Sequence, residues 1–328
     1  MSVEAVALLA LAGTYAVVNG LNDGGSLAGA AMQGSRLRPV TVVLILSAAV
    51  VLVPLAAGAP VARTLATRLV DFGGGPGSIA LAIAVLVAVA VTGVLAWLRL
   101  PTSLTLATVG AFVGTGLGSP LAVDGGEVVR VLLLGVAAPV LGAVVAYGLM
   151  LLIRTPVLSR AGRAGPGVRA VTSTLVAVAY AANDGQKMIA VAVVAGGAGA
   201  ATAARPGPGL LLGLAVAFML GTLVGMRRSG ATLGRGVVNA RQSYLASSEV
   251  AAAGAVGLTG WLGAPVSMTQ SLAGSLAGSG VSEGLRRVRW RLASRLMLAW
   301  VVTFPAALLL AGLVAWLTFG LGGAGGGA

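Results

Sequence analysis

Apolar runs long enough to cross a lipid bilayer fill most of this sequence and constrain its fold more than any other feature. About 20 consecutive apolar residues form a helix that spans the hydrocarbon core, and the mean hydropathy of the chain is +1.01. We count ten apolar segments, roughly at residues 4–33, 40–60, 78–98, 101–118, 128–153, 168–198, 209–226, 245–262, 264–282 and 292–318. We therefore predict an all-α, polytopic protein of the cell membrane, surrounded by the lipid bilayer, with a single integral domain over residues 1–328.

Some of these segments have unusual lengths. Those at 4–33 and 168–198 are longer than one crossing needs, and polar residues interrupt them. Those at 101–118, 245–262 and 264–282 are short, so they could form re-entrant hairpins or half-helices in place of full crossings. We predict broken helices in the two long segments and leave re-entrant hairpins open for the three short ones.

Charge and residue usage exclude several classes of protein. The net charge of +13 comes from 20 arginines and one lysine against eight acidic residues, and most arginines lie in short links between apolar runs. Such links carry the orientation signals of membrane proteins, so we expect no nucleic acid partner. The chain has no cysteine and no histidine, which removes disulfides, thiolate metal sites and the commonest proton relay. We expect no cofactor and assign no metal site.

The arginines also predict how the chain is oriented. With ten crossings and the N-terminus outside, most arginines fall on the cytoplasmic side, where positive residues are favoured. That side then holds Arg36, Arg169, the link at 154–167 and the cluster at Arg286–Arg295, which could also touch anionic lipid. We therefore predict that both termini lie outside and that the Arg-rich link at 154–167 is cytoplasmic.

Two short patterns occur twice in the chain at nearly the same separation. Asn22-Asp23-Gly24 corresponds to Asn183-Asp184-Gly185, about 161 residues later. Pro101-Thr-Ser103 corresponds to Pro265-Val-Ser267, about 164 residues later. Two unrelated coincidences would not share an offset, so the patterns indicate one duplicated unit that covers most of the chain.

The duplication divides the predicted domain into two five-segment halves, residues 1–153 and residues 168–318. Because five crossings bring the chain to the other side of the membrane, the second half must run in the opposite orientation. Inverted-topology repeats with polar breaks at matching positions are typical of secondary transporters, whose substrates bind near the midplane where the halves meet. We predict this arrangement here.

Ionisable residues inside two apolar segments mark a candidate cation site. Asp and Lys cost about 2.5–3.5 kcal/mol each at the centre of a membrane helix, so they indicate a function or an internal ion pair. Asp184 and Lys187 are three residues apart and could partly neutralise each other. Asn–Asp beside glycine predicts an unwound turn that offers oxygen ligands to Na⁺, or a carboxylate that carries H⁺. The candidate cation ligands are Asn22, Asp23, Asn183 and Asp184.

The Pro-x-Ser-x-Thr patterns at 101–105 and 265–269 predict two helix starts. Proline is tolerated in the first helical turn, where hydroxyls satisfy or supplement the free N–H groups. A helix N-terminus with exposed N–H groups and hydroxyls binds oxyanions, although ordinary capping would explain either pattern alone. Their duplication beside a duplicated Asn–Asp favours an anion site, and hence a cation-coupled anion symporter.

These motifs resemble those of the inorganic phosphate transporter (PiT) family. Val18–Asp23, followed by Ser35–Pro39, is similar to the first signature of that family, and Ala182–Lys187 is similar to its second signature in the bacterial form. Leu100–Ser103 and Gly263–Ser267 look like its paired Pro-x-Ser segments. The resemblance covers essentially the whole chain. It implies import of inorganic phosphate with H⁺ or Na⁺.

The resemblance also implies roles for individual residues. The two Asn–Asp pairs would bind cation and phosphate together. The residues that would contact phosphate are Ser103, Thr105, Ser267, Thr269, Asn22, Asn183, Gln186 and Lys187. The histidine that often follows the hydroxyl residues in the family is replaced by Leu106 and Gln270, so the coupling ion stays open.

Other functions fit part of the pattern. A sulfate permease of the same family is the main rival, but sulfate carries no proton at neutral pH to offer Asp23 or Asp184. An intramembrane aspartyl hydrolase could use the same two carboxylates, but it would not need the duplicated helix starts. An anion channel would pass phosphate without a cation. We expect a secondary transporter and not an enzyme; assembly into a homo-oligomer stays open.

Overall fold

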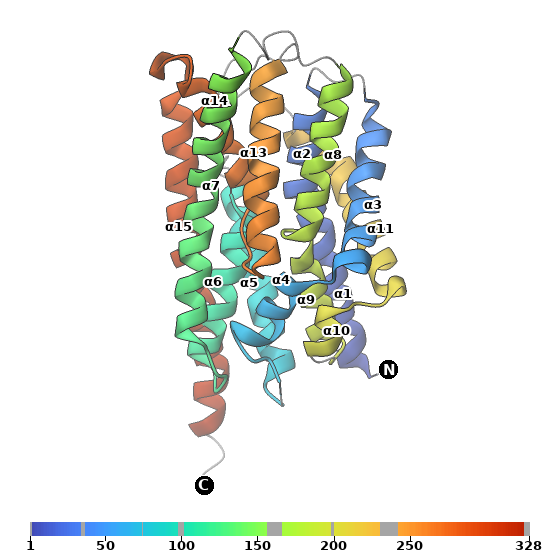
Figure 1. Cartoon of the computed structure of the whole chain (residues 1–328). Helices are drawn as coiled ribbons and strands as arrows, with labels where there is room; N and C mark the ends of the chain where they lie inside the picture. Colours follow the sequence, from blue (N-terminus) through green and yellow to red (C-terminus); the bar gives the residue numbers. More distant parts are fainter. Residues whose placement is uncertain are drawn as a thin grey trace.

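The computed structural model describes residues 2–33, 37–73, 75–97, 102–155, 166–197, 200–229 and 242–324. Within these ranges the chain is a bundle of helices (Figure 1), with no strand beyond an isolated antiparallel bridge between Val70 and Val123. The predicted all-α fold is therefore confirmed. Most of the Arg-rich link at 154–167 lies outside the described residues, as do Arg36 and Pro101.

Helices in the first half of the chain follow the apolar segments. They are α1 (Val3–Asn19), η1 (Gly20–Gly24), α2 (Gly25–Met32), α3 (Pro39–Ala57), α4 (Pro60–Arg63), η2 (Thr64–Arg68), α5 (Gly77–Trp97), α6 (Leu104–Gly118) and α7 (Gly125–Ile153). The elements η1 and η2 are single π-helical turns. Pro39 and Pro60 begin their helices, where the missing N–H of proline removes no helical hydrogen bond.

The described part of the second half is helical as well. Its elements are α8 (Pro166–Ala182), α9 (Gln186–Ala195), α10 (Ala200–Ala204), α11 (Pro208–Ser229), α13 (Gln242–Trp261), α14 (Met268–Val281), the 3₁₀ turn η3 (Leu285–Arg287) and α15 (Trp290–Ala324). The start of α1 and the end of α15 lie at the same end of the bundle (Figure 1). This placement fits an even number of crossings, and which side of the membrane it faces stays a prediction.

Among the described residues, six helices are long and apolar enough to cross a membrane. They are Val3–Met32, Pro39–Ala57, Gly77–Leu95, Gly125–Ile153, Pro208–Met226 and Trp290–Gly320. The other predicted segments are shorter or more polar: α6 has 15 residues and α14 has 14, whereas α8, α9 and α13 carry buried charges. The chain is thus a multi-pass membrane protein. The ten crossings, the inverted repeat and the re-entrant hairpins stay predictions.

Two short central helices pack against the long helix that ends the other half of the chain. α6 packs on α15, and α14 packs on α7. Glycines make both contacts close, because a Cβ at Gly114 would lie 2.1 Å from the Leu308 carbonyl oxygen and one at Gly278 would lie 2.0 Å from that of Ala143. The glycine one turn earlier in each helix packs in the same way. The small-xxx-small spacing in the sequence indicates this close packing, and the structure confirms it.

The prediction of an unwound turn in the first long segment is wrong. Residues 3–32 form one continuous helical run, into which η1 inserts a π turn at Gly20–Gly24. A π turn adds one residue while keeping the backbone hydrogen-bonded; here the Gly25 N–H bonds to the Gly20 oxygen. α11 packs directly against this turn, and a Cβ at Gly225 would lie 2.1 Å from the Leu21 oxygen.

The second long segment is interrupted, as expected. α8 ends at Ala182, and α9 begins at Gln186 after a three-residue turn. Within that turn the Gly185 N–H bonds to the Tyr180 oxygen at 2.8 Å, and the Asn183 N–H bonds to the same oxygen at 3.2 Å. Asp184 therefore lies in the break itself, and Lys187 lies in the first turn of α9.

Candidate functional site

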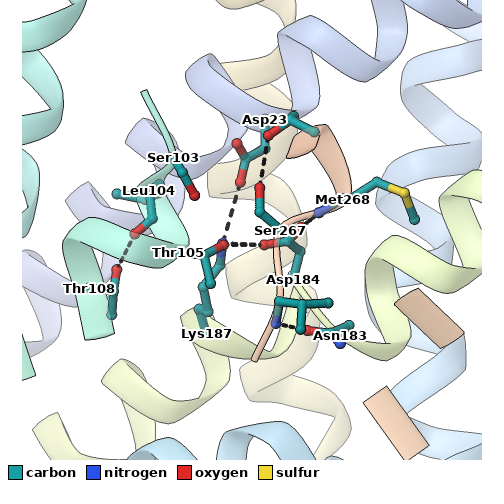
Figure 2. Close-up of polar contacts among 12 residues, drawn as sticks. Asp23, Ser103, Leu104, Thr105, Thr108, Asn183, Asp184, Lys187, Ser267 and Met268 are labelled. Atoms are coloured by element: carbon teal, nitrogen blue, oxygen red, sulfur yellow. Dashed lines mark hydrogen bonds and ion pairs between the residues drawn. The ribbon is translucent and has the colours of Figure 1, made fainter. Parts of the chain in front are cut away.

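The aspartates of the two Asn–Asp motifs meet at a buried charged centre around Lys187 (Figure 2). The Lys187 ammonium contacts Asp184 Oδ1, and its Nζ lies 3.4 Å from Asp23 Oδ2. Lys187 Nζ also donates to Thr105 Oγ1 at 2.6 Å, and that hydroxyl donates to Asp184 Oδ1 at 2.8 Å. All four side chains are buried. The structure thus joins residues that lie 164 positions apart in the sequence.

The first turns of α6 and α14 border this centre. Ser103 Oγ and Ser267 Oγ each accept a hydrogen bond from the N–H three residues later, at 3.3 and 3.4 Å, so both serines cap their helices as predicted. At the start of α14 the Met268 N–H donates to Asp184 Oδ2. Helix N-termini favour negative charge, and here the α14 N-terminus binds a carboxylate.

Further hydroxyl groups extend the polar centre. Ser267 Oγ and Thr269 Oγ1 lie 2.9 Å apart, which places the predicted second hydroxyl pair at the same helix start. On the α6 side, Tyr15 OH lies 2.6 Å from Thr108 Oγ1, and both residues are buried. Sequence reasoning missed Tyr15 and Thr108. The only signal was that each is a hydroxyl-bearing side chain in an apolar segment close to a motif.

The side chain of Asn183 forms hydrogen bonds mainly to backbone groups and does not face an open site. Its Oδ1 accepts from the Val266 N–H at 3.0 Å. Its Nδ2 donates to the carbonyl oxygens of Ala264, at 3.0 Å, and of Val256, at 3.2 Å, and to Thr259 Oγ1 at 3.3 Å. The side chain is fully buried. Asn183 therefore fixes the segment that leads into α14; its role as a cation or phosphate ligand stays a prediction.

Gln186 also bonds to backbone. Its Oε1 accepts from the N–H groups of Val61 and Ala62, at 2.8 and 3.1 Å, and its Nε2 donates to the Ala182 oxygen at 2.7 Å. These bonds connect the start of α9 to the start of α4. In this structure Gln186 positions α9, and a direct contact with phosphate stays a prediction.

Asn22 is less constrained than its counterpart Asn183. It is half-buried, and its Nδ2 donates to Asp23 Oδ1 at 2.8 Å. Its backbone oxygen accepts from Ser26 Oγ at 2.8 Å. The first motif therefore carries fewer side-chain bonds to the rest of the protein than the second.

A second buried ion pair lies apart from this centre and corrects one prediction. Arg169 belongs, by sequence, to the arginines that orient the cytoplasmic end, but it is fully buried and contacts Glu249. Its Nη2 donates to the Ala30 oxygen at 3.3 Å, and Glu249 Oε1 accepts from Ser173 Oγ at 3.2 Å. The signal missed in the sequence was Glu249, an ionisable residue within an apolar segment.

The electrostatics of the centre set what it can bind. Two carboxylates and one ammonium sum to a formal charge of −1 when all three are ionised. Oxygen atoms of Asp23, Asp184 and Thr105 are the hard ligands that a small cation prefers. The N–H groups and hydroxyls at the starts of α6 and α14 are donors suited to an oxyanion. The centre therefore offers partners for a cation and for an anion.

Comparison with known proteins gives a consistent answer. A profile described as "Phosphate transporter family" matches residues 19–170 and 166–311. A probable low-affinity inorganic phosphate transporter of Mycobacterium bovis is 33% identical over 314 residues, covering 92% of this chain and 74% of the relative. One of Rhizobium meliloti is 28% identical over 331 residues and covers 94% of each chain.

A solved structure has the same fold. It is titled "The sodium-dependent phosphate transporter", and it matches with a TM-score of 0.79 at 19% identity over 97% of this chain and 99% of its own. The relatives are named as transporters, in agreement with a non-enzymatic role. Together with the two matched regions, which span nearly the whole sequence, these similarities show that the chain belongs to the phosphate transporter family.

Proposed function

We propose that the chain carries inorganic phosphate across the membrane together with a cation, H⁺ or Na⁺, and that both bind around Asp23, Asp184 and Lys187. The observation that carries the proposal is the meeting of these three charged residues in a buried centre between α6 and α14. Ionisable groups buried in a membrane protein line ion and substrate pathways. Family membership supports phosphate as the substrate.

The formal charge of the centre explains why the anion would enter with a cation. Phosphate would add negative charge to a buried site whose own charge is already −1, and an uncompensated buried charge is strongly unfavourable. A Na⁺ bound to the carboxylates, or a proton on one of them, would supply the missing positive charge. The charge balance of the site therefore supports entry of phosphate together with a cation.

The phosphate would lie at the first turns of α6 and α14. Ser103, Thr105, Ser267 and Thr269 carry the hydroxyl donors there, and the Lys187 ammonium adds a positive charge. The Met268 N–H of α14 now donates to Asp184. It would become available to phosphate when a cation or a proton binds that carboxylate. Cation and anion binding would then depend on each other through one group.

Alternating access fits the way the halves exchange helices. α6 of the first half packs on α15 of the second, and α14 of the second packs on α7 of the first, so the site lies between two interlocked pairs. We propose ten crossings in two inverted halves, residues 1–153 and 168–318. Both termini would lie outside, with the link at 154–167 inside.

The rival functions are less well supported by the geometry. Sulfate could not donate a hydrogen bond to either carboxylate at neutral pH, whereas protonated phosphate could. A hydrolase dyad of the aspartic type shares one proton between two carboxylates, but here the Lys187 ammonium lies between Asp23 and Asp184. An anion channel would not need a carboxylate pair.

Uptake into proteoliposomes tests the proposal. Labelled phosphate and labelled sulfate are offered separately, with a Na⁺ gradient alone and with a pH gradient alone. We expect phosphate to accumulate above equilibrium under at least one gradient and sulfate to compete weakly. Phosphate flux that runs only down its own gradient and does not depend on the Na⁺ or pH gradient would identify a channel. Preferred accumulation of sulfate would identify the sulfate permease.

A further inference from the structure

A large apolar groove lies on the lipid-facing side of the bundle, between α7 and α15. It has a volume of about 970 Å³, and small residues of α14 such as Ala273 and Ala277 help to form its floor. Its walls are open to the surroundings: Val136 and Val301, on the two opposite helices, are each 69% exposed. Among the residues that the structure describes, none that lines it is charged. A space of this kind within a membrane is filled by hydrocarbon, not by water.

The groove runs from one end of the bundle to the level of the charged centre. On α15 it extends from Trp290 to Pro305, which is about 22 Å at 1.5 Å per residue. One leaflet of the hydrocarbon core is about 15 Å thick, so a single acyl chain fits along the groove. Its deep end is lined by Thr105, Ser267 and Gln270.

Several arginines lie close in the chain to Trp290, which lines the outer end of the groove. Exposed arginines occupy η3, the short link after it and the start of α15, at positions 286, 287, 289, 291 and 295. Among the described residues, no carboxylate lies within ion-pair distance of Arg291 or Arg295. Trp290 lines the groove and donates from its indole N–H to the Leu285 oxygen at 2.9 Å. A half-exposed tryptophan of this kind is typical of the headgroup level of a membrane.

We propose that this groove is a binding site for an anionic phospholipid. One acyl chain would lie between α7 and α15, and the phosphate would bind Arg291 and Arg295 at the groove end. The end of the chain would then cover the side of the substrate centre at Thr105 and exclude lipid and water from it. Binding itself does not depend on the proposed transport function; only this sealing role does.

The charges favour a lipid over a second copy of the protein. Two copies that met through this face, about an axis along the membrane normal, would bring two arginine clusters together at the same depth. Like charges at close range repel, whereas an anionic headgroup neutralises the cluster. The apolar groove and the positive end together match a phospholipid.

Native mass spectrometry of the delipidated full-length protein tests the site with two probes, phosphatidylglycerol and phosphatidylcholine. We expect tight retention of phosphatidylglycerol and roughly tenfold or greater loss in the double variant Arg291→Gln/Arg295→Gln, because each arginine near an anionic headgroup favours binding. The matched control is Arg63→Gln/Arg68→Gln, two exposed arginines in α4 and η2, which should retain the lipid as wild type does.

A second variant tests the groove itself. A Cβ at Gly135, which lines the groove on α7, would meet no atom within 4 Å, and the same holds for Gly148 on α7 outside the groove. We expect Gly135→Phe to displace phosphatidylglycerol and Gly148→Phe to leave it bound. Equal retention of both lipids by wild type, or undiminished binding in Gly135→Phe, would overturn the proposal. A dimer that dissociates in Gly135→Phe would assign the face to a second copy instead.

Discussion

The two Asn–Asp–Gly motifs share a sequence but not a backbone. The first lies on a π turn within a continuous helix, and the second lies in a break between α8 and α9. Asn183 makes four hydrogen bonds and is fully buried, whereas Asn22 is half-buried and bonds to its neighbour Asp23. The same residues therefore form a fixed anchor in one half and a less restrained element in the other.

This difference indicates that the aspartates of the two motifs have different roles in the site. Asp184 is held by Lys187, Thr105 and the Met268 N–H. Asp23 reaches Lys187 only at 3.4 Å and otherwise accepts from Asn22. We infer that Asp184 belongs to the framework of the site as well as to its chemistry, and that Asp23 can change partners more easily during transport.

The largest expected effect comes from the two aspartates. Asp184→Asn removes the nearest counter-charge of buried Lys187, and breaking a buried pair costs about 3–5 kcal/mol, so the variant should lose stability as well as transport. Asp23→Asn should abolish gradient-driven phosphate accumulation but remain folded. Thermal unfolding of the purified proteins and uptake per folded molecule separate the two effects. Near-normal, gradient-dependent uptake in either variant would contradict the paired site.

The next largest difference between the two motifs is expected when Asn183 and Asn22 are replaced in turn. Asn183→Ala leaves several buried backbone groups without a partner, at roughly 1–3 kcal/mol each, so the melting temperature should fall strongly. Asn22→Ala should change stability little and should weaken coupling, because Asp23 loses its amide donor. Melting curves and uptake at several cation concentrations measure both. A stable Asn183→Ala protein with normal uptake would show that the anchor is not needed.

The glycines that follow each aspartate sharpen the comparison further. A Cβ at Gly24 would lie 2.1 Å from Thr222 Oγ1 and 2.8 Å from the Phe218 ring, whereas one at Gly185 would meet Ala181 Cα at 3.2 Å. Gly24→Ala should therefore lower stability by about 1–3 kcal/mol through overpacking, and Gly185→Ala by less. Chemical unfolding of both variants tests the order. The reverse order would mean that the π turn has room that the structure does not show.

The smallest expected loss of stability follows removal of the serine caps. Ser103→Ala and Ser267→Ala should each cost about 1 kcal/mol of stability as capping residues. If each hydroxyl also binds phosphate, the half-saturation level should rise at least tenfold, since a hydrogen bond to a charged ligand contributes roughly 1.5–3 kcal/mol. Initial rates of uptake, measured as a function of phosphate concentration, show whether the hydroxyls bind phosphate as well as cap their helices. Unchanged half-saturation in both variants would leave the serines with capping alone.

The sequence predicted the parts of this site that depend on local chemistry. Asp184 and Lys187 are three residues apart on an apolar segment, so their pairing was expected, although Asp184 lies in the turn before α9 and not on a helix. The serine caps followed from the residue pattern at helix starts. The glycine contacts followed from the four-residue spacing of small side chains.

Features that depend on distant partners could not be predicted in the same way. The π turn at Gly20–Gly24 depends on α11, which packs against it from nearly 200 residues away. The bonds of Asn183 and Gln186 to backbone groups depend on where the segment before α14 and the start of α4 come to lie. Burial of Arg169 depends on Glu249, because a lone arginine near a segment end otherwise reads as an orientation signal.

The exchange of helices between the halves has a consequence for the order of assembly. Gly114 of α6 packs on Leu308 of α15, which leaves the ribosome roughly 190 residues later. At about 5–20 residues per second, α6 must wait some 10–40 s for its main partner. During that time its 15 residues, shorter than a full crossing, have α5 as their main neighbour in the described part of the first half. The first half is therefore complete in sequence before it is complete in structure, because α6 lacks its main partner until α15 has been made.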